Sequence, residues 1–128
     1  MTIVVICMAI VVFMPMLAKV PLAMMMNKQG GYDNRLPREQ QKNLEGLGAR
    51  SKAAHENCFE ATTFFAPTIL LVLALNSVNH TTAYLCIMFV VVRLAYLVCY
   101  WSDWHLLRSL FWGIGMVTVA AHYYLLLS

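Results

Sequence analysis

The sequence has few charged residues. Lysine and arginine together number 9 and aspartate and glutamate 6, so only 12% of the 128 residues are charged. A water-soluble domain usually has about 25% charged residues. The missing charge is replaced by hydrophobic residues, which make up 61% of the chain. The net charge of +3 is concentrated in one loop rather than spread along a face, which excludes a nucleic-acid-binding surface.

Paired cysteines are also missing. The four cysteines form no C-x-x-C pair, and no histidine lies at ligand spacing from any of them. A disulfide framework or a zinc site is therefore not expected, and no other metal site is predicted. Reduced, buried thiols are the simplest interpretation of Cys7, Cys58, Cys86 and Cys99, because all four have apolar neighbours.

Long apolar runs dominate the remainder and predict four membrane-spanning helices, at about 3–26, 53–76, 83–104 and 110–127. The first run lacks a basic n-region and is nearer the length of a span than of a signal peptide, so we expect it to be retained. Residues 27–52 form the only long polar loop. We expect a helix to start there near Pro37 and Glu39 and to continue without a stop to about Asn76. The fold class is all-α, a single domain over 1–128 forming an antiparallel up-down four-helix bundle.

The orientation of the bundle follows from its cations. Six of the nine lie in or at the ends of the 27–52 loop: Lys28, Arg35, Arg38, Lys42, Arg50 and Lys52. Both ends of the chain and the connection at 76–82 have none. Cytoplasmic loops of membrane proteins are enriched in lysine and arginine. We therefore expect a cytoplasmic 27–52 loop, with both termini facing outward.

Two ionisable residues fall within predicted spans. Glu60 lies a turn into the second span and Arg93 near the middle of the third. An unpaired charge at such a depth costs at least about 2.5 to 3.5 kcal/mol. We expect both side chains to face the bundle interior, a polar cavity or each other.

The neighbours of these two residues repeat at helical spacing. Arg50, Asn57 and Glu60 fall on one stripe of a helix, and Arg93, Tyr96 and Tyr100 fall on another. Arg108 and Ser109 follow at the inner corner before the fourth span. Together these groups suit a polar, zwitterionic ligand that enters from the cytoplasm. A structural role remains open, in which Glu60 and Arg93 form an interhelical ion pair that fixes packing.

Two motifs resemble a known family. The stretch from Arg50 to Glu60 (RSKAAHENCFE) is similar to the second-helix signature of the MAPEG family, the membrane-associated proteins of eicosanoid and glutathione metabolism. The stretch from Arg93 to Tyr100 (RLAYLVCY) is similar to the third-helix pattern of that family. The loop from Tyr32 to Arg38 (YDNRLPR) resembles bacterial members, which implies a bacterial inner membrane with the active site toward the cytoplasm.

The resemblance implies a homotrimer that binds glutathione, as co-substrate, between adjacent subunits. Asn57 and Glu60 would then hold the γ-glutamyl end, and Arg108 would approach the thiol with Ser109 beside it. The remaining stripe residues, which would contact carboxylates and backbone groups of the tripeptide, are Arg50, Arg93, Tyr96 and Tyr100. The chain departs from the synthases of the family at Ala53 and Ala61, where they have an arginine and a tyrosine. These departures predict weaker glutathione binding or a different ligand.

The function predicted on this basis is that of a glutathione-dependent membrane transferase or peroxidase. Its hydrophobic, electrophilic small-molecule substrate would arrive through the membrane lipids. A non-catalytic lipid-binding or scaffold protein of the same fold is the alternative. A small multidrug exporter is a third, weaker hypothesis, because the acidic residue lies in the second span rather than the first and the charge bias fixes one orientation.

Overall fold

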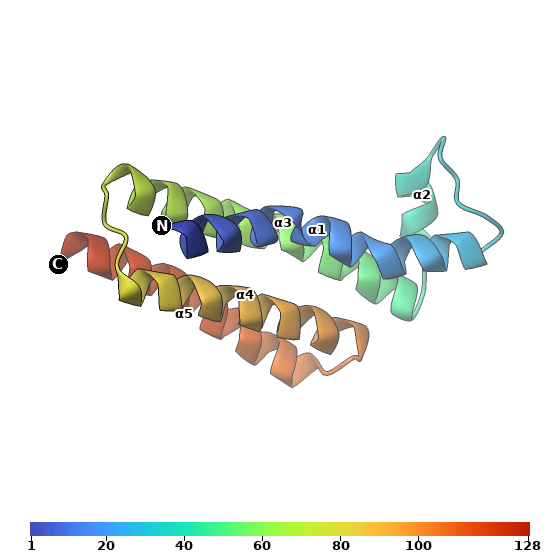
Figure 1. Cartoon of the computed structure of the whole chain (residues 1–128). Helices are drawn as coiled ribbons and strands as arrows, with labels where there is room; N and C mark the ends of the chain where they lie inside the picture. Colours follow the sequence, from blue (N-terminus) through green and yellow to red (C-terminus); the bar gives the residue numbers. More distant parts are fainter.

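The computed structural model describes all residues, 1–128, and is built entirely from helices (Figure 1). Its elements are α1 (Thr2–Lys28), α2 (Pro37–Lys42), α3 (Leu47–Ala74), α4 (His80–Trp101) and α5 (His105–Leu127). All but α2 are long and apolar enough to cross a membrane. The predicted all-α, four-helix architecture is confirmed.

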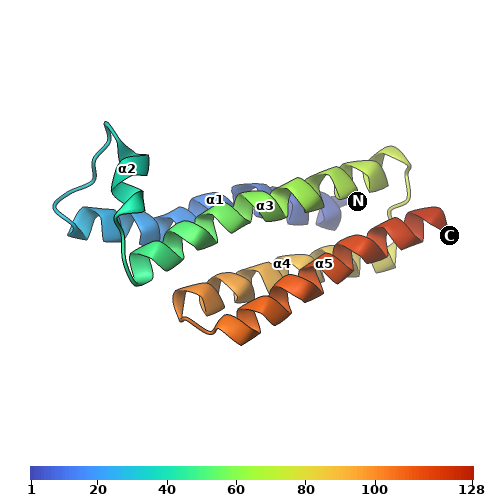
Figure 2. The same ribbon diagram turned by 180° about the vertical axis from the view of Figure 1, so that it is seen from behind.

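The long helices pack as two hairpins. Helix α1 lies along α3, and α4 lies along α5, with the closest packing inside each of these pairs. Both chain ends lie at one end of the bundle and α2 lies at the other, as the view from behind also shows (Figure 2). The short α3–α4 and α4–α5 connections make sequential helices antiparallel.

The predicted continuous helix from Glu39 into the second span is wrong. Helix α2 ends at Lys42, and α3 begins only after Gly46, whose φ of 53° lies in the left-handed region. The break lets Leu44 turn inward and pack with Leu22 and Met26 at the end of α1. Burial of one leucine against another helix is a tertiary effect, and it overrides a helix-compatible local sequence.

The membrane helices begin earlier than their apolar runs. Helix α4 starts at His80, where Asn79 and Thr82 form a reciprocal capping box: the Thr82 amide donates to Asn79 Oδ1 at 2.9 Å. Helix α5 starts at His105, so Arg108 lies in its first turn rather than in the corner that precedes it. Hydropathy marks where a helix enters lipid, whereas caps mark where the helix begins.

The prolines of α1 do not interrupt the helix. Pro15 has no amide proton, so the carbonyl of Val11 lacks its usual partner four residues later. The hydroxyl of Thr62 on α3 shares its proton between the Cys58 carbonyl of its own helix, at 2.9 Å, and this Val11 carbonyl, at 3.3 Å. A side chain of the neighbouring helix therefore partly satisfies the backbone group that the proline frees.

The core is divided unequally along the bundle. The half near the termini contains ten buried apolar residues from all four long helices, including the stacked rings of Phe65 and Phe89. The half near α2 contains two smaller clusters, of five and three buried residues, and none of these residues comes from α5. The four cysteines are all buried and free.

Candidate functional site

Arg93 is the largest fully buried side chain, with 1% of its surface exposed. Its Nη2 donates to the side-chain oxygen of Asn57 at 2.7 Å and to the Asn57 carbonyl at 3.3 Å. The guanidinium also lies over the ring of Tyr96, with Cζ 4.1 Å from the ring centre. A charge at this depth is thus paired with an amide dipole and an aromatic face from α3 and α4.

Asn57 connects this buried cation to the surface. Its Nδ2 donates to Glu60 Oε2 at 2.7 Å, while its Oδ1 accepts from Arg93. Glu60 and Arg93 therefore make no direct ion pair within the chain, and the alternative in which they pair across the helices is not formed. Of the three placements expected for Glu60, the bundle interior is also excluded, because its side chain is exposed on the single subunit. One hydrogen-bonded row, Arg93–Asn57–Glu60, runs from the core to the outside of the subunit.

A cavity of about 250 Å³ opens beside this row. It lies between α3, α4 and α5, and it exists because the first half of α5 buries none of its side chains: all the buried residues of α5 fall between Gly115 and His122. The lining residues are Asn57, Tyr96, Tyr100, Arg108, Ser109 and Trp112. No carboxylate lines the cavity, so its charge is that of Arg108.

Arginine and tyrosine side chains are stacked along one wall of the cavity. The rings of Tyr96 and Tyr100 meet edge to face, with centroids 5.5 Å apart. The guanidinium of Arg108 lies 4.4 Å from the centre of the Tyr100 ring, just as Arg93 lies over Tyr96. Contact with an aromatic face attracts a cation and limits where it can move. Arg108 is therefore held against the Tyr100 ring at the wall of the cavity.

The structure brings most of the predicted site residues together. Asn57, Tyr96, Tyr100, Arg108 and Ser109 share the cavity, and Arg93 and Glu60 each lie one hydrogen bond away from Asn57. The Ser109 hydroxyl donates to the His105 carbonyl at 3.1 Å.

Arg50 does not join the cavity. Its Nε and Nη2 donate to the carbonyl of Trp101, each at 3.4 Å, and its Nη1 lies 3.9 Å from Asp103. It instead ties the start of α3 to the end of α4. Trp112 was not predicted, although it follows Arg108 by four residues and so had to share its face of α5.

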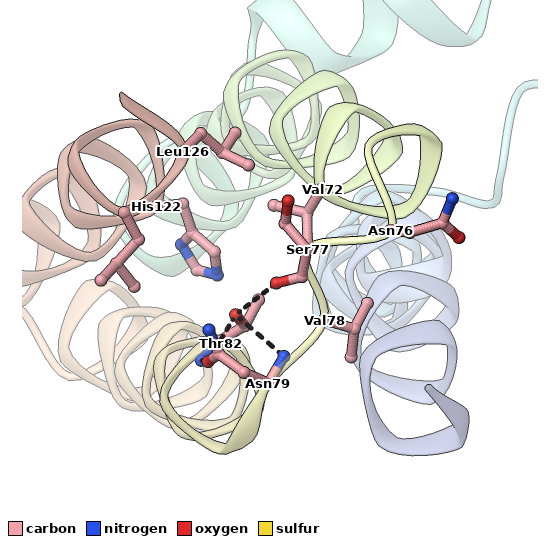
Figure 3. Close-up of a pocket in the computed structure, with 9 residues that line it drawn as sticks. Val72, Asn76, Ser77, Val78, Asn79, Thr82, His122 and Leu126 are labelled. Atoms are coloured by element: carbon pink, nitrogen blue, oxygen red, sulfur yellow. Dashed lines mark hydrogen bonds between the residues drawn. The ribbon is translucent and has the colours of Figure 1, made fainter. Parts of the chain in front are cut away.

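A second cavity, of about 340 Å³, lies at the opposite end of the bundle (Figure 3). Uncharged polar side chains of the α3–α4 connection line it, among them Ser77, Asn79 and Thr82. His122 reaches it from α5, but both its ring nitrogens already have partners, the Thr118 carbonyl at 2.7 Å and the Cys86 sulfur at 3.5 Å. The lining of this cavity contains no charged side chain, and its one histidine has no free nitrogen, which distinguishes it from the cavity beside Asn57.

The chain was compared with known families and proteins. Residues 3–128, essentially the whole length, match the model of the MAPEG family. The chain belongs to the MAPEG family. No curated protein and no solved structure gives a match. Four apolar helices and MAPEG membership make it a multi-pass membrane protein, related in general to membrane glutathione and eicosanoid metabolism.

Proposed function

We propose that this MAPEG protein is a glutathione-dependent membrane transferase or peroxidase that acts on hydrophobic electrophiles. The observation that carries the proposal is the placement of Arg108 and Asn57 on one cavity, with Asn57 hydrogen-bonded to both Arg93 and Glu60. Glu60 would pair with the ammonium of the γ-glutamyl group. The glutathione thiol would then reach toward Arg108 and Ser109.

Arg108 would supply the chemical activation. A free thiol has a pKa of about 8.5, and the thiolate is the nucleophile. A guanidinium donating to the sulfur favours the anion, and lowering the pKa of the thiol by two units requires only about 2.7 kcal/mol. The thiolate sulfur would attack an electrophilic carbon, forming a C–S bond as the leaving group, such as a halide, departs. With a lipid peroxide it would attack one oxygen and break the O–O bond, which gives the lipid alcohol and glutathione sulfenic acid. A second glutathione would then react with the sulfenic acid to form the disulfide and water.

A homotrimer would complete this site. The cavity of about 250 Å³ in one chain is smaller than the roughly 300 to 1,000 Å³ typical of ligand pockets. Glu60 is exposed on the single subunit, and a carboxylate exposed at membrane depth is costly unless it gains a partner. A neighbouring subunit would enclose the ligand and Glu60 together. The cation-rich loop would place this opening toward the cytoplasm.

An unpaired buried donor on Arg93 also supports the binding of a ligand or a neighbouring subunit here. Its Nε is buried and has no acceptor within the chain. Leaving such a donor unpaired costs about 1 to 3 kcal/mol. An acceptor supplied by a ligand or by the adjacent subunit would remove that cost.

The test is titration calorimetry of the detergent-purified protein with glutathione, for the wild type, Glu60→Gln and Arg108→Ala. We expect Glu60→Gln to weaken binding about tenfold or more, the worth of one charged hydrogen bond. We expect Arg108→Ala to retain most binding but to lose the ultraviolet absorbance of the bound thiolate. Glu56→Gln, a surface carboxylate one turn away on α3, is the matched control. Absence of wild-type binding at millimolar glutathione would overturn the proposal.

The alternative is a non-catalytic lipid-binding or scaffold protein of the same fold. Ala61 favours this alternative. Synthases of the family have a tyrosine at this position, whereas Ala61 is buried in the apolar core and offers a ligand no hydroxyl. This alternative predicts that glutathione binds without turnover of any electrophile, or does not bind. An activity screen with a reactive aryl halide and a lipid hydroperoxide separates it from the first proposal.

A further inference from the structure

A third cavity, of about 370 Å³, lies at the end of the bundle near α2, away from the glutathione site. It is formed by one face of α2 and one face of α3. Its lining residues recur at helical spacing on both elements: Arg38, Gln41 and Lys42 on α2, and Lys52, His55, Glu56 and Phe59 on α3. Two helix faces that meet over seven side chains form a cleft rather than a chance indentation of a loop.

Gln40 makes three hydrogen bonds that hold helix α2 in place. The Nε2 of Gln40 donates to the carbonyls of Met26, at 2.9 Å, and Gly31, at 2.8 Å, and its Oε1 accepts from the Asp33 amide at 2.9 Å. These bonds fix α2 to the end of α1. The cavity therefore has two fixed walls.

The charge of this cavity is positive. Three cations line it, Arg38, Lys42 and Lys52, against the single carboxylate of Glu56. Lys52 is paired with Glu56 at 3.1 Å, and Lys42 is paired with Glu39, outside the cavity, at 2.7 Å. Arg38 has no carboxylate partner. A guanidinium without a carboxylate is suited to bidentate bonds with phosphate oxygens.

The opposite end of the cavity is apolar and faces lipid. Phe59, 55% exposed, lies on α3 one turn deeper than Glu56, and the ring of His55 meets it edge to face at 5.1 Å. His55 also bonds the Pro15 carbonyl of α1 at 2.9 Å. A ligand in this cavity would meet cations at one end and the exposed ring of Phe59 at the other.

We infer that the cleft between α2 and α3 binds the phosphate headgroup of an anionic membrane phospholipid, with Arg38 and Lys52 contacting the phosphate and the acyl chains descending past Phe59. A free phosphate would satisfy the cations but would leave Phe59 unused, and an acidic peptide would not extend into the hydrocarbon. The site shares no lining residue with the glutathione cavity.

The test is equilibrium binding of fluorescent phosphatidylglycerol to the full chain in an uncharged detergent, with phosphatidylcholine of the same acyl chains as reference. Each cation near a membrane surface contributes about fivefold to the binding of anionic lipid. We therefore expect Arg38→Gln with Lys52→Gln to weaken phosphatidylglycerol binding about 25-fold, and to weaken phosphatidylcholine binding much less, because its choline ammonium offsets the charge of the phosphate. The matched control is Lys28→Gln with Arg35→Gln, which removes the same charge from the same loop but outside the cavity.

An equal loss in both double variants would reduce the effect to general surface charge and overturn the inference. Displacement of the lipid by an equal concentration of inorganic phosphate would also overturn it, in favour of a free-phosphate site. Phe59→Ala, an exposed side chain whose loss does not threaten folding, is the second variant. We expect it to weaken lipid binding about fivefold through lost apolar contact. Unchanged lipid affinity in Phe59→Ala would exclude the proposed path of the acyl chains.

Discussion

The two halves of the bundle are built on different principles. Near the termini, the four long helices meet over apolar side chains, with Phe65 stacked on Phe89 at a centroid distance of 4.2 Å. Near α2, the first half of α5 buries none of its side chains, and α3 and α4 are joined by the hydrogen bond from Arg93 to Asn57. The half near the termini has the larger apolar core and only an uncharged cavity at its end, whereas the other half leaves a cavity lined by Arg108 and an exposed carboxylate.

This difference separates stability from ligand binding within one small chain. Apolar packing fixes the relative positions of the helices near the termini. The polar half then holds Asn57, Tyr100 and Arg108 around a space that packing does not fill. Substitutions in the half near the termini should mainly lower the free energy of unfolding. Substitutions in the half near α2 should mainly lower the affinity for glutathione.

The largest expected effect is that of Phe65→Ala. The ring is fully buried against Phe89, and truncation of a buried phenylalanine costs about 3 to 5 kcal/mol of unfolding free energy. Glutathione affinity per folded molecule should be unchanged. Thermal unfolding in detergent and calorimetry measure the two quantities, with Phe13→Ala, an exposed phenylalanine of α1, as the control. A large fall in affinity of the remaining folded protein would show that the halves are coupled.

Arg93→Met should give the opposite pattern. Methionine keeps the volume but removes the hydrogen bonds to Asn57, and a charged hydrogen bond is worth about 1.5 to 3 kcal/mol. Glutathione binding should therefore weaken about 10- to 150-fold. Stability should change little, because replacing a buried charge by an apolar side chain is often neutral. A clear fall in the thermal unfolding temperature, with unchanged glutathione affinity of the folded protein, would assign Arg93 to packing alone.

Tyr100→Leu should have a smaller effect on the thiolate. It removes the ring under Arg108, a contact worth about 0.5 to 1 kcal/mol. The fraction of bound glutathione present as thiolate, followed by ultraviolet absorbance, should fall about two- to fivefold. Tyr100→Phe retains the ring and serves as the control. If Tyr100→Phe lost as much thiolate as Tyr100→Leu, the hydroxyl rather than the aromatic face would be responsible.

The smallest effect is expected at Thr62. Thr62→Val removes the hydroxyl that bonds the Val11 carbonyl, and such bonds within membranes average about 0.6 kcal/mol. Pro15→Ala supplies the missing amide to the same carbonyl, so Thr62→Val should cost less in a Pro15→Ala background. A double-mutant cycle by thermal unfolding measures this coupling. If the two substitutions changed the free energy of unfolding independently, the Thr62 hydroxyl and residue 15 would not be coupled through the Val11 carbonyl.

Sequence predicted the helices because apolar runs and caps are local features. The break between Lys42 and Leu47 was missed because it depends on Leu44 packing against Leu22, a contact between distant segments. The spacing of residues along the chain predicted which polar side chains share a face of α3 or of α4. It does not show which side chain on one helix bonds which side chain on another. It could not indicate that Arg93 bonds Asn57 rather than Glu60, or that Arg50 turns to Trp101. The homotrimer and bound glutathione stay predictions.

All four native thiols are enclosed by the bundle, each with no more than 5% of its surface exposed. A cysteine introduced on the outside of the molecule would therefore be the only one within easy reach of a polar alkylating reagent. The wild-type chain is thus a ready background for labelling from either side of a sealed vesicle, without prior removal of its own sulfhydryls. Replacement of Asn34 in the cation-rich loop and of Ser128 at the far end would report directly which side of the membrane each occupies.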